Sequence, residues 1–218
     1  MTKNSRSHNV LLVEGKEDVR VIPELIEANG IAWGTKKNPV VYIKENNGYD
    51  NLIKPDVICT ELKASGLSAL GIMIDADDDP RGRWQSLRNT CLSSIPDLPE
   101  KLPETGLIHL TSNQVRFGVW MMPDNQMQGM LENFIAYMIP DESELIWQFA
   151  QNITIEAKQK GALFKETHQD KANIYTWLAW QNPPGRQLHQ AINQKILNPK
   201  HPKAQKFVNW FKILYNLS

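Results

Sequence analysis

Two short acidic motifs in this 218-residue chain supply the side chains that metal-assisted chemistry requires. Carboxylates gathered at one point repel one another unless a cation lies between them. Ligand sets made only of oxygen favour Mg²⁺ or Mn²⁺ over zinc. The motifs therefore predict a shared Mg²⁺ or Mn²⁺ site. Their acidic residues are Glu14, Asp18, Asp75, Asp77 and Asp79.

Each motif directly follows an apolar run that is typical of a buried parallel strand, at residues 10–13 and 69–74. The carboxyl ends of parallel strands meet at one edge of a sheet, where open α/β folds place their binding sites. Alternate side chains of an extended chain point the same way, so Asp75 and Asp77 are expected to converge. Asp79 stands before a proline and would cap a helix whether or not it also binds a metal.

The remaining periodicity predicts an α/β fold, with a mostly parallel sheet flanked by helices and a helical C-terminal region. Residues 9–140 are expected to form the α/β core, and residues 141–218 a helical region packed on it. Further strands are expected at residues 40–43, 107–110 and 115–120. Helices are expected at residues 19–26, 50–65 with an interruption at Pro55, 81–92, 127–138, 142–160, 171–180, 186–196 and 204–217.

The composition argues against secreted, membrane and fibrous classes. Hydrophobic residues make up 41% of the chain and charged residues 22%, a balance typical of soluble globular proteins. No apolar run approaches the roughly 18 residues of a membrane helix, and the first residues lack the apolar stretch of a signal peptide. Cys59 and Cys91 form no Cys-x-x-Cys pair, so we expect a cytoplasmic location and neither a disulfide nor a cysteine-built zinc site.

The formal net charge of zero hides an uneven distribution along the chain. Residues 156–218 contain ten Lys or Arg and three Asp or Glu, a net charge of +7, so the preceding part carries −7. A metal-dependent enzyme that acts on a polyanion could use such a basic segment beside an acidic site. A solvated helical face explains the same charges equally well.

The two motifs resemble the signature of the Toprim (topoisomerase-primase) domain, in which one apolar strand ends in Glu-Gly and a later strand ends in Asp-x-Asp. The resemblance covers residues 9–120. It implies that Glu14, Asp75 and Asp77 bind Mg²⁺ for phosphodiester chemistry. Asp79 extends the second motif to its Asp-x-Asp-x-Asp form.

A closer resemblance is to Toprim nucleases of the overcoming-lysogenization-defect (OLD) type. Asp18 matches their second acidic residue, four positions after the glutamate, and Glu132 corresponds to a later glutamate in a helix. Lys171 corresponds to a downstream lysine that assists their chemistry, although a solvated lysine at a helix start would also suit this position. The whole chain also resembles a small stand-alone Toprim-like family, a likeness that supports the fold rather than an activity.

Basic residues close to the two motifs are candidates for contacts with nucleic-acid phosphates. Arg83 could equally pair with the nearby carboxylates. The candidates are Lys16, Arg81, Arg83 and Arg88.

These residues predict a nuclease that uses Mg²⁺ or Mn²⁺ to hydrolyse phosphodiester bonds of DNA or RNA. The residues expected to act in catalysis are Glu14, Asp75, Asp77 and Lys171. OLD-type enzymes carry an ATPase, and no Gly-x-x-x-x-Gly-Lys-Ser/Thr loop occurs here, so ATP regulation would need an ATPase or other protein partner. Two alternatives stay open. One is a non-catalytic Toprim-like module that binds nucleic acid or a protein partner, and the other is a phosphatase-like phosphoryl-transfer enzyme.

Overall fold

A five-stranded sheet forms the centre of the protein in the computed structural model, which describes residues 8–218. The strand order is β4-β1-β5-β7-β6, and every neighbouring pair is parallel except β6 with β7. This arrangement confirms the predicted α/β class with a mostly parallel sheet. The strands of the sheet are β1 (Asn9–Val13), β4 (Tyr42–Glu45), β5 (Ala69–Asp75), β6 (Leu107–Leu110) and β7 (Arg116–Met122).

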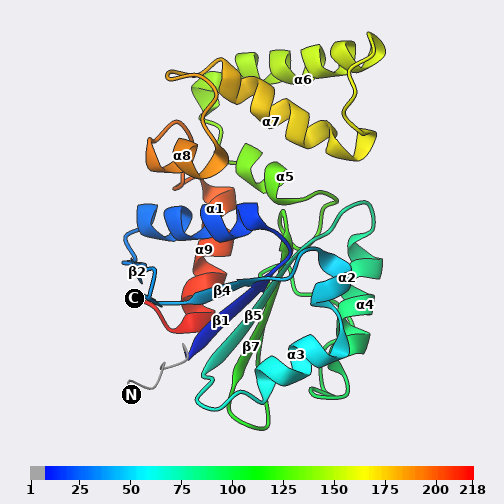
Figure 1. The fold of residues 1–218 in the computed structure, drawn as a ribbon, viewed down its shortest axis with the longest axis vertical. Coiled ribbons are helices and arrows are strands. Elements are labelled where there is room, and N and C mark those ends of the chain that lie inside the picture. The colour runs from blue at the N-terminus through cyan, green and yellow to red at the C-terminus, as the bar shows by residue number, and fades with distance from the viewer. Residues whose placement is uncertain (1–7) are drawn as a thin grey trace.

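Helices follow most strands and dominate the second half of the chain, as Figure 1 shows. A short hairpin of β2 (Gly34–Thr35) and β3 (Asn38–Pro39) precedes β4. The helices are α1 (Lys16–Ala28), α2 (Tyr49–Leu52), α3 (Pro55–Leu62), α4 (Pro80–Cys91), α5 (Leu131–Ala136), η1 (Asp141–Ser143), α6 (Glu144–Gln159), η2 (Glu166–His168), α7 (Gln169–Ala179), α8 (Leu188–Asn193) and α9 (Pro202–Tyr215).

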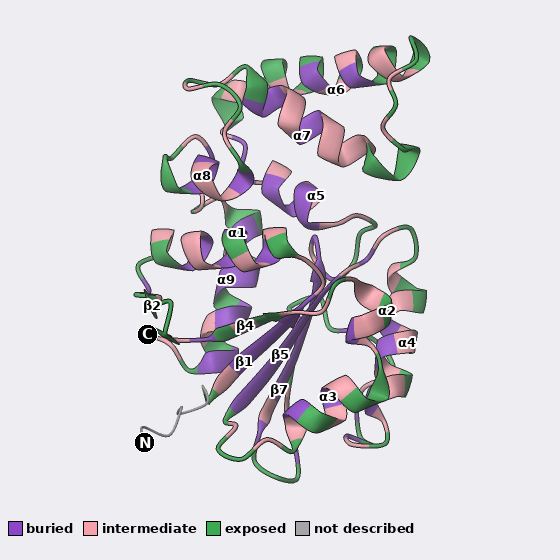
Figure 2. Ribbon diagram, in the orientation of Figure 1, coloured by how far each residue is buried: buried purple, intermediate pink, exposed green. Residues whose placement is uncertain are grey.

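Helices cover both faces of the sheet, so its central strands β1, β5 and β7 are buried, whereas the edge strands β4 and β6 are partly exposed (Figure 2). Helices α3 and α4 lie on one face, and α1 and α9 lie on the other (Figure 1). Alternate side chains of β1 divide between the two layers. Leu11 belongs to the apolar cluster that includes α1 and α9, and Leu12 belongs to the cluster that includes α3 and α4.

Helix α9 approaches the sheet closely because two glycines face it. Gly71 of β5 and Gly118 of β7 are partners in the parallel pair. A Cβ atom at Gly118 would lie only 2.6 Å from Cδ2 of Leu214, so a larger residue there would force the Leu214 side chain to shift. The hydroxyl of Tyr215 also donates a hydrogen bond to the Val10 carbonyl, at 2.9 Å. Helix α9 therefore packs directly on the sheet.

The structure shifts or shortens some predicted elements. The strand predicted at residues 40–43 is β4, which begins at Tyr42. The helix predicted at residues 50–65 is divided at Pro55 into α2 and α3, because proline suits the first turn of a new helix. The helix predicted at residues 127–138 is only the short α5, since the preceding residues form a loop.

Within residues 8–218, none of the helices combines the length and the apolar character that crossing a lipid bilayer requires.

The close approach of α9 can be tested with Gly118→Ala. We expect this variant to lower the free energy of unfolding by about 1–3 kcal/mol, because the added methyl group overpacks the contact with Leu214. Urea unfolding measures the change. In Gly118→Ala/Leu214→Ala the methyl group gains room, so the double variant should cost less than the sum of the single variants. Purely additive costs would contradict the contact.

Candidate functional site

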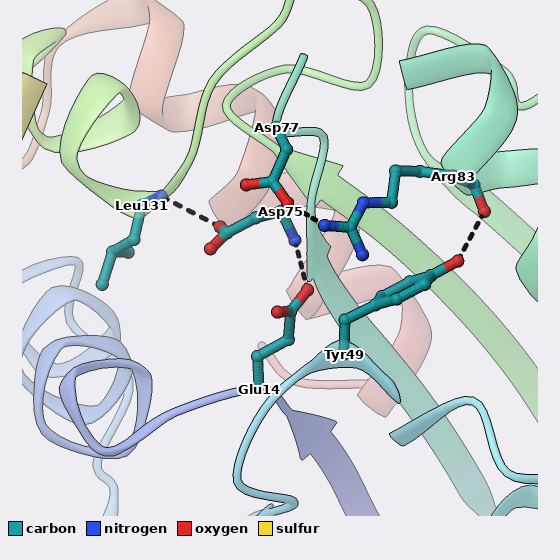
Figure 3. Close-up of polar contacts among 6 residues, drawn as sticks. All are labelled: Glu14, Tyr49, Asp75, Asp77, Arg83 and Leu131. Carbon is teal, nitrogen blue, oxygen red and sulfur yellow. Dashed lines mark hydrogen bonds and ion pairs between the residues drawn. The ribbon is translucent and has the colours of Figure 1, made fainter. Parts of the chain in front are cut away.

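The two acidic motifs meet at the carboxyl edge of the sheet. Strands β1 and β5 pair in parallel, so Glu14, which follows β1, lies beside Asp75, which ends β5. The carboxylate Oε1 of Glu14 accepts a hydrogen bond from the backbone N–H of Asp75 at 2.9 Å (Figure 3). This contact joins motifs that are far apart in the sequence.

Backbone N–H groups at helix starts hold two further carboxylates in place. Oδ1 of Asp75 accepts a hydrogen bond at 3.0 Å from the N–H of Leu131, the first residue of α5 (Figure 3). Oδ2 of Asp18 accepts a hydrogen bond at 2.9 Å from the N–H of Gly15, at the start of α1. Helix starts carry N–H groups without partners inside the helix, so they suit carboxylates.

Burial and mutual repulsion raise the pKa values of these carboxyl groups. Burial, with the negative charges of Glu14 and Glu132, raises the pKa of Asp18 to about 7 from its ordinary 3.8. Burial, with the charges of Asp18 and Glu14, raises the pKa of Asp75 well above its ordinary range. Burial also raises the pKa of Glu14. The carboxyl groups of Glu14, Asp18, Asp75 and Glu132 therefore lie close enough to repel one another. A cation bound among them would relieve this repulsion.

The structure brings Glu132 and Lys171 together. Nζ of Lys171 in α7 lies 3.0 Å from Oε1 of Glu132 in α5. The Glu132 side chain is 6% exposed and that of Lys171 is 45% exposed, so the pair lies where the buried cluster reaches solvent. Burial lowers the pKa of Lys171, but the Glu132 carboxylate, with Tyr175 and Glu17, raises it, so the pKa lies above its ordinary value overall.

Asp77 departs from the geometry that the sequence predicts. Its φ of +48° is left-handed, so the chain is not extended there and the alternation assumed for Asp75 and Asp77 fails. Two backbone hydrogen bonds of 2.9 Å fix this conformation, one in each direction between Asp77 and Gly129. The Asp77 carboxylate pairs with the guanidinium of Arg83, whereas that of Asp75 points to Leu131 (Figure 3).

Asp79 caps α4, as the sequence predicts. Its Oδ1 accepts a hydrogen bond from the N–H of Gly82 at 2.9 Å, and Pro80 is the first residue of the helix. The side chain is exposed.

The basic candidate residues have different surroundings. Lys16 and Arg81 are exposed. Arg88 donates hydrogen bonds to the carbonyls of Leu98 and Pro99, and so holds the loop after α4. Arg83 lies partly buried against the carboxylates, in line with the pairing that the sequence left open.

Three residues that contact the site are not predicted from the sequence. Tyr49 stacks under Arg83, with the guanidinium carbon 3.8 Å from the ring centre. The N–H of Leu131 and the backbone of Gly129 hold Asp75 and Asp77, respectively. Backbone donors leave no mark in a sequence, but a glycine directly before Met130-Leu131-Glu132 was a signal for a tight backbone contact.

The donor set suits a hard divalent cation, because it consists only of carboxylate oxygens. The side chains are nevertheless not gathered as a finished coordination sphere. Among residues 8–218, no three or more His, Cys, Asp or Glu side chains form a group that could hold a metal ion as they stand. Asp77 and Asp79 already have other partners, so some side chains would have to turn to bind one.

Two clefts differ in their relation to the site. One, of about 470 Å³, has Glu132, Tyr137 and Trp147 among its lining residues. Another, of about 650 Å³, lies between α1 and α8 and is lined by none of the predicted site residues. The first cleft therefore reaches the acidic cluster at Glu132.

The fold and the site together define an α/β protein with buried carboxylates at the carboxyl edge of a mostly parallel sheet. The chain belongs to the family described as "Protein of unknown function (DUF3226)", whose model matches residues 8–216. Among solved structures, the C-terminal region of the Burkholderia pseudomallei OLD protein is similar, with 13% identity and a TM-score of 0.48 over 96% of this chain and 98% of that one. A likeness at this level says nothing about activity. Comparison with curated proteins gave no match.

The raised pKa of Asp18 predicts a pH dependence of stability. Between its ordinary pKa of 3.8 and about 7, Asp18 keeps a proton in the folded state that the unfolded chain loses. The contribution of Asp18 to the free energy of unfolding is therefore full at low pH and is lost as the pH rises towards 7.

Asp18→Asn should remove this dependence. In urea unfolding with a chelator present, the wild type should lose more stability than Asp18→Asn between about pH 4 and about pH 7. Parallel curves for the two proteins would contradict the raised pKa.

Proposed function

We propose that this protein hydrolyses phosphodiester bonds of DNA or RNA with Mg²⁺ or Mn²⁺ bound at its acidic edge. The observation that carries the proposal is the convergence of Glu14, Asp18, Asp75 and Glu132 from separate elements into one buried field. A chain that only needed to fold would gain little by burying carboxylates that repel one another. The resemblance of both motifs to the Toprim signature supports phosphodiester chemistry over other uses of a cation.

In this proposal, the acidic residues divide into those that hold a cation and those that support it. Glu14, Asp75 and Asp77 are the ligands. Asp18 and Glu132 complete a second position or orient water, and Asp79 joins them only if it leaves its capping role. When bound, divalent cations stabilise the negative charge that develops on the phosphate and lower the pKa of an attacking water.

The Glu14–Asp75 contact sets the spacing of the two motifs before any cation binds. Oε1 of Glu14 accepts from the Asp75 N–H, and the backbone of Tyr49 also donates to this carboxylate, so its position is fixed. Asp75 likewise uses Oδ1 for the Leu131 N–H. Preorganised ligands bind with less loss of conformational freedom than mobile ones.

Lys171 is the residue proposed to act on the substrate phosphate. Its ammonium group borders the cluster and is partly exposed, so an incoming phosphate can reach it. A fixed positive charge there would stabilise the charge of the transition state. Glu132 keeps this lysine charged and in place.

Nucleic acid is the proposed partner, with basic side chains of the segment 156–218 near its path. An ATPase or other protein partner stays part of the proposal, because the sequence has no nucleotide-binding Gly-Lys loop of its own.

A second candidate is a non-catalytic module that binds nucleic acid or a protein through the same edge. It is favoured by one observation, namely that Asp77 and Asp79 are already engaged by Arg83 and by the start of α4.

Cleavage assays separate the two candidates. We expect the wild type to cleave DNA or RNA with Mg²⁺ or Mn²⁺, and Asp75→Asn to lower the rate by roughly a hundredfold or more, because it removes a ligand. Asparagine keeps the oxygen that accepts from Leu131, so the fold should be retained.

Asp78→Asn is the matched control, since Asp78 is exposed and lies three residues after Asp75. This variant should retain full activity. Cation binding by calorimetry without cleavage of any substrate would favour the binding module.

Lys171 can be tested separately with Lys171→Gln. We expect kcat to fall by roughly a hundredfold, because the lysine acts on the phosphate. Lys165→Gln removes an exposed lysine of the same region and should have little effect. Equal activities of the two variants would show that Lys171 only balances the charge of Glu132.

A further inference from the structure

The guanidinium of Arg83 lies between the two acidic motifs. It forms an ion pair with the carboxylate of Asp77 (Figure 3). It also acts on the first motif, because burial raises the pKa of Glu14 and the charge of Arg83 opposes that rise. One side chain of α4 thus supplies positive charge to acidic residues of both motifs.

Arg83 is also held by contacts that do not depend on Asp77. Its guanidinium carbon lies 3.8 Å from the centre of the Tyr49 ring, and the Tyr49 hydroxyl donates a hydrogen bond to the Arg83 carbonyl at 3.1 Å. Tyr49 begins α2, and the N–H of the preceding Gly48 donates to the Glu14 carbonyl at 2.8 Å. Arg83 would therefore stay beside the acidic edge if Asp77 turned away.

Asp77 is the carboxylate that is best able to turn. Its side chain is 39% exposed and that of Arg83 is 23% exposed, so neither lies in a closed interior. Asp75, in contrast, is tied to Leu131 inside the cluster. The left-handed backbone of Asp77 is fixed by Gly129, which leaves its side-chain torsions as the free variables.

We propose that Arg83 is an exchangeable counter-ion, which pairs with Asp77 while no divalent cation is bound and pairs with a substrate phosphate once Asp77 has turned to the cation. The inference rests on the proposed function of the acidic edge. Guanidinium groups bind carboxylates and phosphates with the same fork of donors, so the exchange replaces one pair with an equivalent one. Cation binding would thereby prepare the phosphate site.

The two roles of Arg83 have opposite consequences. Because Arg83 and the cation compete for one carboxylate, loss of the arginine should tighten cation binding. Because the freed guanidinium holds the phosphate, the same loss should weaken nucleic-acid binding. Loss of a purely structural arginine would not produce these two opposite effects together.

Arg83→Gln tests the competition directly, with Arg81→Gln as the matched control for loss of charge on the same helix. By calorimetry with Mg²⁺ and Mn²⁺, we expect Arg83→Gln to bind the cation roughly fivefold more tightly than the wild type. This change in affinity corresponds to the loss of one partly exposed ion pair that competes with the cation. Arg81→Gln should change the affinity less, since Arg81 is exposed. Equal affinities of the two variants would overturn the inference.

A second measurement follows the phosphate. Fluorescence anisotropy of a short single-stranded oligonucleotide with Ca²⁺, in place of the cations proposed to support turnover, should show weaker binding by Arg83→Gln than by Arg81→Gln. Unchanged oligonucleotide affinity would overturn the phosphate role. Thermal unfolding of each variant checks that it is folded.

Tyr49→Leu is a second variant in case Arg83→Gln does not fold. It keeps the charge and removes the aromatic support, so the oligonucleotide affinity should fall without any gain in cation affinity. A gain in cation affinity in this variant would contradict the support assigned to the ring.

The outcomes separate this inference from the proposed function. If the wild type binds the cation and cleaves, but Arg83→Gln binds it no more tightly than Arg81→Gln, only the inference fails. If neither the wild type nor Arg83→Gln binds a cation, both fail. Binding by Arg83→Gln where the wild type shows none would support the competition most strongly.

Discussion

The cost of burying several negative charges at one edge of a sheet is the constraint on which the other features of the site depend. Backbone donors and basic side chains offset that cost. Glu14 accepts from the N–H of Asp75, which in turn accepts from the N–H of Leu131. Lys171 and Arg83 add positive charge from two sides. The start of α5 and the packing of α7 are therefore tied to the charges that end β1 and β5.

Much of this framework is predictable from the sequence, because it follows from short-range patterns. Apolar runs identify β1 and β5, and the geometry of parallel strands brings Glu14 next to Asp75. A proline after Asp79 marks the start of α4 and the capping role of that carboxylate. Residues 131–136 and 169–179 are helical as expected, although no periodicity indicates that Glu132 and Lys171 touch. Their pairing arises from how α5 and α7 pack.

The parts that sequence patterns miss depend on contacts between distant segments. Asp77 adopts its left-handed conformation because the backbone of Gly129 bridges to it, and no local rule makes an aspartate after a strand turn in this way. Arg83 points at the carboxylates because Tyr49 supports it, whereas Arg81, two residues earlier, is exposed. Identical residue types in one helix thus have different roles, and only the fold distinguishes them.

The contact between Tyr215 and Val10 joins residues 205 positions apart, and this has a consequence for synthesis on the ribosome. Strands β1, β5 and β7 emerge long before α9, which covers one of their faces. Helix α1 covers part of that apolar face, and the rest of it gains its cover only when residues 202–215 have left the exit tunnel. The contact that joins the first strand to the last helix therefore forms only after the strands that carry the acidic edge have been made.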